Sequence, residues 1–443
     1  MHLLSLLNVL LLVLLQVEGK STGFEQNCTI FVGANGTLNE TCQCESDLSY
    51  PCASLVLALQ GAKNFSGSVK IVIEPGWYSL TERVSFDSKT GLGIFGNDGA
   101  AQVVIECQPF AGIAFKQSNN IIMENLSFVG CGARHLSTSM NFSSMSSHLP
   151  RLHFQVALLF LLSEDITISH LIVRSSNGTG VALMNTIGDI VITESLFANN
   201  TANGTGNIPG GGGIYVEFSK CISPNFELGH LNPYTSNSTY ILTNNHFLDN
   251  EASTGEFDAT HQFSRPDCEH QFSFGRGGGL AVFFKDDARH NHVYVTNTIL
   301  KRNWAKVGAG LVVSIENGSQ NNSVMVASTL FVSNECYKQV VPPSTFSTGG
   351  GAGLFFLLYS RETITNYIVF EHCNFTNNFA YQGGGIAILS TSVASALATT
   401  NTAVFKNCTF ERNVGRVGAA VNIFHWLSLP NATREGYSAL APE

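Results

Sequence analysis

The stretch YIVFEHCNFTNNFAYQGGGIAIL, residues 367–389, decides the fold because it combines three features that recur along the chain. An apolar segment leads to an aromatic residue, Phe375, and an asparagine, Asn378, follows three positions later. A glycine run that starts at Gly383 then opens a second apolar segment at Ile386. Short apolar segments bounded by turn residues are typical of β-strands rather than helices.

The same unit recurs along the chain, which indicates a structural repeat. The residues that align with Phe375 are Phe128, Val173, Phe197, Phe247, Leu300, Phe331 and Phe410. From Phe197 onward an asparagine follows three positions later, at Asn200, Asn250, Asn303, Asn334, Asn378 and Asn413. The glycine-rich steps that come next start at Gly210, Gly277, Gly308, Gly349, Gly383 and Gly418. One set of strands per repeat predicts a solenoid in which each coil stacks on the next.

Columns through the aligned units show which side chains face inward. Apolar residues stand seven and five positions before the aligned residue, for example Ile121 and Met123 before Phe128, and this period of two predicts strands buried on one face. A polar column stands three positions before it, at Asn125, His170, Glu194, Asn244, Asn297, Ser328, His372 and Asn407. We expect this column to form a corner where side-chain amides hydrogen-bond from coil to coil at a spacing of about 4.8 Å. The pattern predicts an all-β, single-stranded parallel β-helix of about ten coils.

The F-x-x-N and G-G-G-I elements of the quoted stretch resemble the repeats of chlamydial polymorphic outer-membrane proteins. More broadly, the chain is similar to the pectin-lyase-like superfamily over roughly residues 70–424. This resemblance implies a right-handed parallel β-helix. It leaves function open, because one scaffold of this kind hosts both enzymes and non-enzymatic proteins.

The regions that flank the repeats define four segments. Residues 1–19 are predicted to be a signal peptide, since the apolar stretch 3–15 is shorter than the roughly 20 residues that span a bilayer. Residues 20–68 are expected to form an N-terminal cap with a short helix from Cys52 to Gly61, and residues 69–424 the β-helix with its loop insertions. The tail 425–443 contains Pro430 and Pro442, so it is a poor cover for the last coil. We therefore expect association through the C-terminal end of the solenoid.

Sequons for N-glycosylation occur throughout the chain and, behind a signal peptide, predict a secreted or cell-surface glycoprotein. Their asparagines are Asn27, Asn35, Asn39, Asn64, Asn125, Asn141, Asn177, Asn199, Asn203, Asn237, Asn317, Asn321, Asn374, Asn407 and Asn431.

The chain contains 11 cysteines, which agrees with an oxidising compartment. A group of four near the N-terminus predicts a disulfide-bonded cap, with several connectivities possible, and consists of Cys28, Cys42, Cys44 and Cys52. Cys107 and Cys131 each follow a strand segment one coil apart, so we expect a disulfide between them.

Cys373 and Cys408 both stand two positions before an aligned phenylalanine and therefore belong to adjacent coils. Their side chains are expected to point in parallel directions, which is unfavourable for the torsion of a disulfide. The sequence predicts a stacked pair of thiols.

Composition excludes some classes of partner. The formal net charge is −9, and the 23 Lys and Arg residues are scattered, with Lys301 and Arg302 the only adjacent pair, so no basic stripe for nucleic acid is present. The glycine runs open apolar strands, whereas a dinucleotide fingerprint opens a helix. The sequence predicts no cofactor.

Catalytic elements are sparse. Polygalacturonase-type members of the superfamily use clustered aspartates with basic partners, and the chain offers only Asp286 and Asp287 with Arg289 nearby. A solvated turn between two strands accounts better for these residues, because adjacent strand residues point to opposite faces and cannot form a carboxylate pair.

A Ca²⁺ site is a weak alternative at a second group of acids. Asp165 and Asp189 occupy the same repeat column one coil apart, and Glu194 lies near them in sequence. Carboxylates on adjacent coils can hold Ca²⁺. Asn120 fills the same column, so turn capping explains the column without metal.

Two functions remain open from the sequence. The missing catalytic elements favour a non-enzymatic scaffold that presents loops for recognition of an extracellular glycan or protein, including adhesion. The alternative is a polysaccharide lyase or glycoside hydrolase with a diverged site.

Overall fold

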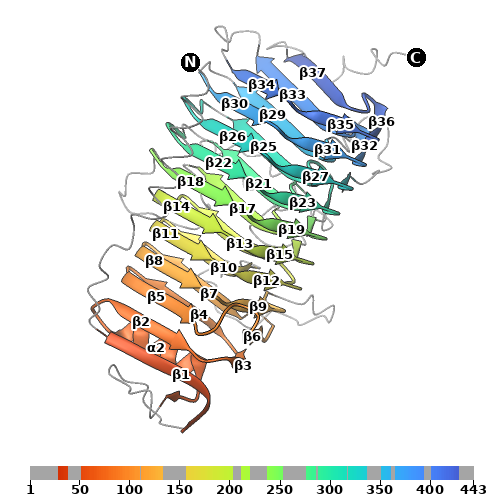
Figure 1. The fold of residues 1–443 in the computed structure, drawn as a ribbon. Coiled ribbons are helices and arrows are strands. Elements are labelled where there is room, and N and C mark those ends of the chain that lie inside the picture. Colours follow the sequence, from red (N-terminus) through yellow and green to blue (C-terminus); the bar gives the residue numbers. More distant parts are fainter. Residues whose placement is uncertain are drawn as a thin grey trace, which may run out of the picture.

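The computed structural model describes residues 28–37, 51–109, 111–132, 156–202, 211–219, 237–252, 276–285, 288–316, 318–336, 351–360, 365–393 and 401–428. Its strands form four sheets of 11, 10, 10 and 6 strands, and every strand pair is parallel. The strands stack along one axis into an elongated solenoid, with the first and last coils at opposite ends (Figure 1). The predicted fold is confirmed: the chain forms a right-handed, single-stranded parallel β-helix.

The bounds of the strands show how the coils supply the sheets. Sheet A consists of β1 (Cys28–Thr37), β2 (Val69–Ile73), β5 (Thr90–Gly96), β8 (Asn119–Glu124), β11 (Glu164–Ser169), β14 (Ile187–Thr193), β18 (Thr239–Thr243), β22 (His292–Thr296), β26 (Ser323–Ala327), β30 (Tyr367–Glu371) and β34 (Thr402–Lys406). Sheet B consists of β3 (Gly76–Leu80), β6 (Val103–Cys107), β9 (Ser127–Val129), β12 (Ile172–Arg174), β15 (Leu196–Ala198), β19 (His246–Leu248), β23 (Ile299–Lys301), β27 (Leu330–Val332), β31 (Asn374–Thr376) and β35 (Thr409–Glu411).

The other two sheets complete each coil. Sheet C consists of β4 (Arg83–Asp87), β7 (Gly112–Lys116), β10 (Val156–Leu161), β13 (Thr179–Met184), β17 (Ile214–Phe218), β21 (Leu280–Phe284), β25 (Leu311–Glu316), β29 (Leu354–Ser360), β33 (Ile386–Val393) and β37 (Val421–Ser428). The short sheet D consists of β16 (Thr201–Ala202), β20 (Glu251–Ala252), β24 (Trp304–Ala305), β28 (Glu335–Cys336), β32 (Phe379–Gln382) and β36 (Val414–Val417).

One coil corresponds to the repeat unit at residues 367–389. It runs through β30, β31, β32 and β33, and so contributes one strand to each of the four sheets. The three corners of this coil lie at His372, Asn377 and Gly383, whose φ angles are 54°, 55° and 60°. Left-handed backbone at a single residue turns the chain sharply, and Gly and Asn tolerate it best. The polar column predicted for a corner is confirmed there: all of its members have φ between 49° and 58°.

The amide ladder expected at that corner lies elsewhere. It is formed by the asparagines three positions after the aligned residue, which are buried from Asn200 to Asn378. A second ladder, which the sequence did not reveal, runs through Asn291, Asn322, Asn366 and Asn401. Both ladders lie inside the coil, where each amide finds a partner on the neighbouring coil. The predicted corner column points largely toward solvent instead, and there His170 pairs with Glu194 at 2.5 Å.

The interior between the sheets is apolar along the whole solenoid. Inward-facing residues form one continuous core cluster from Cys28 to Ile388. Equivalent phenylalanines of adjacent coils stack, with ring centroids 4.5 Å apart for Phe331 and Phe375 and 5.0 Å apart for Phe375 and Phe410. Such stacks add to the burial of apolar area, which is the main stabilising term of the fold.

The helix α2 (Leu55–Asn64) covers the first coil. Its Ser54 side chain accepts a hydrogen bond from the Leu57 N–H at 3.4 Å, and its buried face packs on β1, β3 and β4. The predicted lid is confirmed, but its predicted bounds, Cys52 to Gly61, are wrong because the helix begins at Leu55, after the N-cap Ser54, and continues to Asn64. Lys89 Nζ donates to the carbonyl groups of Phe65 and Gly67 at 2.6 and 2.8 Å, and so supports the chain where it leaves the helix.

Disulfides occur where the sequence predicts them. Cys107 and Cys131 are bridged, with their Cα atoms 4.7 Å apart. Cys28 and Cys52 are each disulfide-bonded as well, while Cys42 and Cys44 lie outside the described residues. Cys373 and Cys408 are thiols, as predicted.

The strands extend beyond the predicted boundaries of the β-helix, residues 69–424, at both ends. β1 pairs with β2, so sheet A begins inside the segment 20–68, and β37 continues beyond Phe424 to Ser428. Residues 1–27 and 429–443 lie outside the described residues. Among the described helical segments, none combines the length and hydropathy needed to cross a membrane.

Candidate functional site

The predicted catalytic residues do not come together as a described site. Asp286 and Asp287 lie outside the described residues. Arg289 is exposed at the corner between sheets C and A, where its backbone pairs with Gln320 on the next coil.

The Ca²⁺ candidates make other contacts. The Asp165 carboxylate accepts a hydrogen bond from the Asp189 N–H at 3.1 Å, which is the turn-capping role considered from the sequence. Glu194 Oε2 lies 2.5 Å from His170 Nε2 on the neighbouring coil. Within the described residues no group of three or more His, Cys, Asp or Glu side chains is arranged to hold a metal ion.

The sequon asparagines are compatible with modification wherever the structure describes their side chains. Asn64, Asn199, Asn237, Asn321 and Asn407 are exposed. Asn125, Asn177 and Asn374 are half-buried. Asn35 lies in β1, and a further set is outside the described residues: Asn27, Asn39, Asn141, Asn203, Asn317 and Asn431.

Sheet C is unusual because both of its faces are buried in its middle strands. Every residue of β10, β13, β17 and β21 is buried. The outward residues form a second apolar cluster, separate from the central core, that includes Leu159, Met184, Phe283 and Val312. A parallel sheet covered on both faces has strands that are apolar at every position, which explains the continuous apolar runs after the glycine steps.

Charged residues are embedded in this covered face. We call them the buried ion cluster, which comprises Tyr215, Glu217, Arg276, Lys285, Ser314 and Glu316. They occupy β17 and β25 and the ends of the segments next to β21, on neighbouring coils.

Each carboxylate of the buried ion cluster has a cation and a hydroxyl group beside it. Lys285 Nζ lies 3.5 Å from Glu217 Oε2, and both side chains are only 6% exposed. Tyr215 donates its phenolic hydrogen to the same carboxylate. Arg276 Nη1 lies 3.4 Å from Glu316 Oε1, which also accepts a hydrogen bond from Ser314 Oγ.

The electrostatics of the buried ion cluster follow from its burial. Desolvation raises the pKa of Tyr215 well above its ordinary value, and the charge of Glu217 raises it further. Desolvation lowers the pKa of Arg276, an effect that the carboxylate of Glu316 opposes. Buried charges persist when they are paired and hydrogen-bonded, as they are here.

This arrangement fits a structural role for the two carboxylates better than a catalytic role. A catalytic carboxylate must reach its substrate, whereas Glu217 is 6% and Glu316 15% exposed and each is engaged by a cation and a hydroxyl group. The repeat pattern does not predict the buried ion cluster, although one signal is present: Glu217, Lys285 and Glu316 are charged residues at the ends of otherwise apolar strands.

A second region, on sheet D, is exposed. The residue that follows each ladder asparagine faces outward, and these residues stack in register from coil to coil. We call this column the exposed strip, which comprises Glu251, Trp304, Glu335, Phe379 and Val414. Trp304, Phe379 and Val414 are 43%, 46% and 53% exposed. These three large apolar side chains therefore stand exposed in one line along sheet D.

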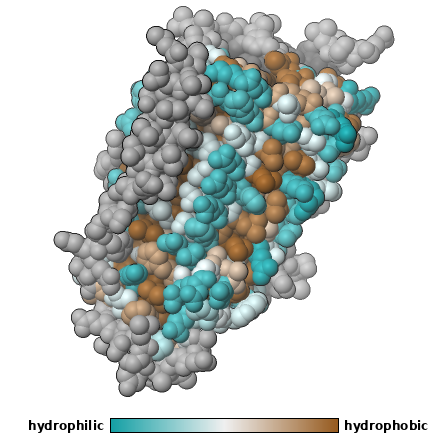
Figure 2. Space-filling view, viewed as in Figure 1, coloured by the Kyte–Doolittle hydropathy of each residue, from teal (hydrophilic) through white to brown (hydrophobic). Residues whose placement is uncertain are grey.

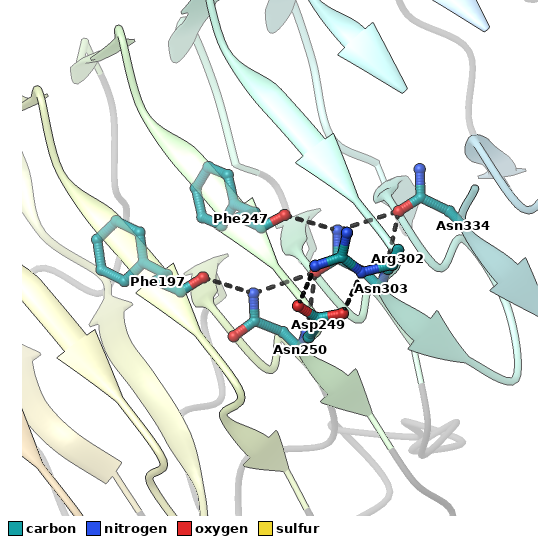
Figure 3. A network of polar contacts seen from close by, with 7 residues as sticks. All are labelled: Phe197, Phe247, Asp249, Asn250, Arg302, Asn303 and Asn334. Atoms are coloured by element: carbon teal, nitrogen blue, oxygen red, sulfur yellow. Dashed lines mark hydrogen bonds and ion pairs between the residues drawn. The ribbon is translucent and has the colours of Figure 1, made fainter. Parts of the chain in front are cut away.

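The asparagine ladder fixes the positions of the exposed strip. Asn303 Nδ2 donates to the Phe247 carbonyl and to Asn334 Oδ1, each at 3.0 Å, and Asn250 makes the same contacts one coil earlier (Figure 3). Because Trp304 directly follows Asn303, its backbone is held by these buried bonds. Fully satisfied amide networks are rigid, so the strip is presented at constant spacing.

Charged groups border the exposed strip. Arg302 forms a bidentate pair with Asp249 on the preceding coil, with both N–O distances at 2.6 Å, beside the ladder in Figure 3. On the face seen in Figure 2, hydrophilic and hydrophobic residues gather in bands that follow the long axis of the solenoid. The strip therefore combines flat apolar rings with polar groups at regular steps.

Comparisons with known proteins give structural similarity alone. No family model and no curated protein matches the sequence. Among solved structures, the chain is similar to the pectate lyase Pel9A, with 10% identity over 93% of this chain and 79% of the other and a TM-score of 0.42. It is also similar to the catalytic domain of a GH87 α-1,3-glucanase in complex with nigerose, with 9% identity over 90% and 69% of the two chains and a TM-score of 0.36. A third similar structure is the A-module of the mannuronan C-5 epimerase AlgE4 of Azotobacter vinelandii, with 12% identity over 82% and 91% and a TM-score of 0.25.

Proposed function

We propose that the protein is an extracellular, non-enzymatic β-helix scaffold that binds an extended glycan along the exposed strip. The observation that carries this proposal is the alignment of Trp304 and Phe379 in one outward column. Two rungs separate the rings, a distance of about 10 Å. A linear polymer with a repeating unit can contact such a column at successive, equivalent positions.

The chemistry of the exposed strip favours sugar over other ligands. The faces of aromatic rings are apolar and pack against the C–H groups of a sugar ring, while Glu251 and Glu335 can accept hydrogen bonds from its hydroxyl groups. The negative formal charge of the chain disfavours polyanionic ligands, so a neutral or cationic glycan fits best.

An extracellular location is supported by independent features. The apolar stretch 3–15 has the length of the apolar region of a signal peptide, and sequons are frequent. Cys107 and Cys131 form a disulfide, which is typical of proteins from oxidising compartments.

The test is a binding assay of residues 20–443 against a panel of polysaccharides. We expect Trp304→Ala and Phe379→Ala each to weaken binding of the positive polysaccharide about tenfold, which corresponds to loss of roughly 1.4 kcal/mol. Trp77→Ala is the matched control, because Trp77 is 67% exposed but lies on sheet B. A panel without any ligand, or equal losses in the control, would contradict the proposal. Binding of a protein instead of a glycan would also contradict it.

A polysaccharide lyase or hydrolase is the second candidate, which the sequence leaves open, although Glu217 and Glu316 are paired with Lys285 and Arg276. The same panel, with and without Ca²⁺, tests for cleavage products. We expect none. Products whose yield falls in Glu217→Gln or Glu316→Gln would establish an enzyme at the buried ion cluster, and products lost in Arg289→Ala would place it at the Asp286 loop.

We also propose self-association through the last described coil. Val414, Val417 and Ile423 on this coil are 53%, 43% and 69% exposed, and β34, β35, β36 and β37 each end a sheet. The opposite end is covered by α2, so the fitting partner is the same end of a second copy. Light scattering of residues 20–443 at micromolar concentration should give a dimer, and Val417→Lys should give a monomer. A monodisperse wild-type monomer would contradict this part of the proposal.

A further inference from the structure

Cys373 and Cys408 lie one above the other in adjacent coils. The register Asn374 to Thr409 and the hydrogen bond of 2.9 Å from the Thr409 N–H to the Cys373 carbonyl align the two residues across the rung. Each thiol lies within 3.6 Å of backbone carbonyl groups, those of Val326 and Glu371 for Cys373 and those of Phe370 and Lys406 for Cys408.

The solenoid already contains one disulfide between adjacent coils. Cys107 and Cys131 are bridged with their Cα atoms 4.7 Å apart, which is the spacing between rungs. That bridge joins residues one position out of register, because the pairing of Glu106 with Val129 places Cys107 opposite Gly130, whereas Cys373 and Cys408 are in register. The spacing between rungs, about 4.8 Å, nevertheless lies within the Cα range of disulfides. The parallel direction of the side chains, which predicts a pair of thiols at Cys373 and Cys408, does not exclude a bridge there.

The two thiols are not equivalent. Cys373 is 1% exposed, whereas Cys408, on the last described coil, is half-buried and is reached from the open end of the solenoid in the monomer. Interaction with Cys373 lowers the pKa of Cys408, and interaction with Cys408, together with burial, raises the pKa of Cys373. Glu371 opposes the shift of Cys408, and His372 and Lys406 are the other titratable groups next to the pair. A partly exposed thiolate beside a buried thiol has the properties of an attacking and a resolving cysteine.

We propose that Cys373 and Cys408 form a thiol–disulfide exchange site, which a small disulfide such as oxidised glutathione converts into a bridge between the two coils. The Cys408 thiolate attacks one sulfur of the small disulfide, whose S–S bond breaks and releases one thiolate. Cys373 then gives its proton to that released thiolate and attacks the mixed disulfide at the Cys408 sulfur, which expels the second small thiolate. The balance is one small disulfide reduced to two thiols and two cysteines oxidised to one cystine.

The experiment equilibrates residues 20–443 in reduced or oxidised glutathione at pH 7, blocks thiols with iodoacetamide and maps the peptides. We expect a Cys373–Cys408 cross-link in the oxidised arm and two alkylated cysteines in the reduced arm. In Cys373→Ser, Cys408 should retain one glutathione, and in Cys408→Ser the glutathione on Cys373 should fall at least about tenfold, since the buried thiol is not the attacking group.

Cys336 provides the matched control. It is buried in a column of alanines between Ala305 and Ala380, and burial raises its pKa to about 12. Cys336→Ala should leave the cross-link unchanged. The wild-type protein decides the question even if a variant misfolds: a Cys373–Cys408 pair that stays reduced in oxidised glutathione overturns the proposal. Glutathione on Cys373 in Cys408→Ser at the level seen on Cys408 would overturn the assigned order.

Discussion

Sheets C and D are built by the same coils, yet they treat their outward-facing residues in opposite ways. On sheet C the outward face is covered, and its charged residues are paired two by two in the buried ion cluster. On sheet D the apolar residues of the exposed strip, Trp304, Phe379 and Val414, are 43% to 53% exposed. The difference shows that the position of a charged or aromatic residue in the repeat does not define its role. Whether another part of the chain covers that face defines it.

The largest effect on stability is expected from breaking a pair in the covered face. Lys285→Met leaves the Glu217 carboxylate buried with its cation removed, and such a change costs about 3–5 kcal/mol. Urea unfolding followed by circular dichroism measures the loss. The double variant Glu217→Gln/Lys285→Met removes both charges and should recover a large part of it. A single variant as stable as wild type would show that this face is open to water.

An intermediate effect is expected from the ladder that supports the exposed strip. Asn303→Ala removes the acceptor of two Asn250 hydrogen bonds and the donor to the Phe247 carbonyl, all in the interior. Buried polar groups left without partners should lower the free energy of unfolding by about 2–3 kcal/mol. Asn64→Ala, at an exposed position at the end of α2, is the control and should change little. Equal effects of the two variants would refute a structural role of the ladder.

The smallest effect is expected in the exposed strip itself. Trp304→Ala should change the free energy of unfolding by less than about 0.5 kcal/mol, because the side chain is 43% exposed and lies outside the core clusters. The same unfolding assay serves here. A loss above about 2 kcal/mol would mean that the ring contributes to packing, and the contrast between the two sheets would then be lost.

The sequence predicts sheets A and B well because their strands are buried on one face. Burial on one face requires an apolar residue at every second position, and this alternation is visible in the sequence, for example at Ile121 and Met123. Sheet D leaves no such pattern, since strands such as β24 contain two residues. In sheet C the sequence does not show which residues face outward, because apolar residues stand at every position of strands such as β10.

The location of the amide ladder shows a different limit. Both the corner column and the column three positions after the aligned residue are rich in asparagine, so composition does not separate them. Asn303 lies inside because its amide finds partners on both neighbouring coils, whereas Asn297 turns the backbone with a φ of 49°. Such partners are set by the stacking of coils, which involves residues 31 to 53 positions apart in these bonds. Thiol pairing, in contrast, follows from the alignment alone, and the sequence predicts it for Cys373 and Cys408.

The ladder also makes the molecule a ruler. Successive asparagines from Asn200 to Asn413 are separated by 50, 53, 31, 44 and 35 residues, yet their amides meet at 2.9 to 3.1 Å in every case. The spacing between coils is therefore independent of how much chain lies between successive ladder asparagines. Insertions in the connecting segments leave this spacing unchanged, while gain or loss of a whole coil lengthens or shortens the column by one rung. Evolution can thus vary the loops and the length of this surface separately.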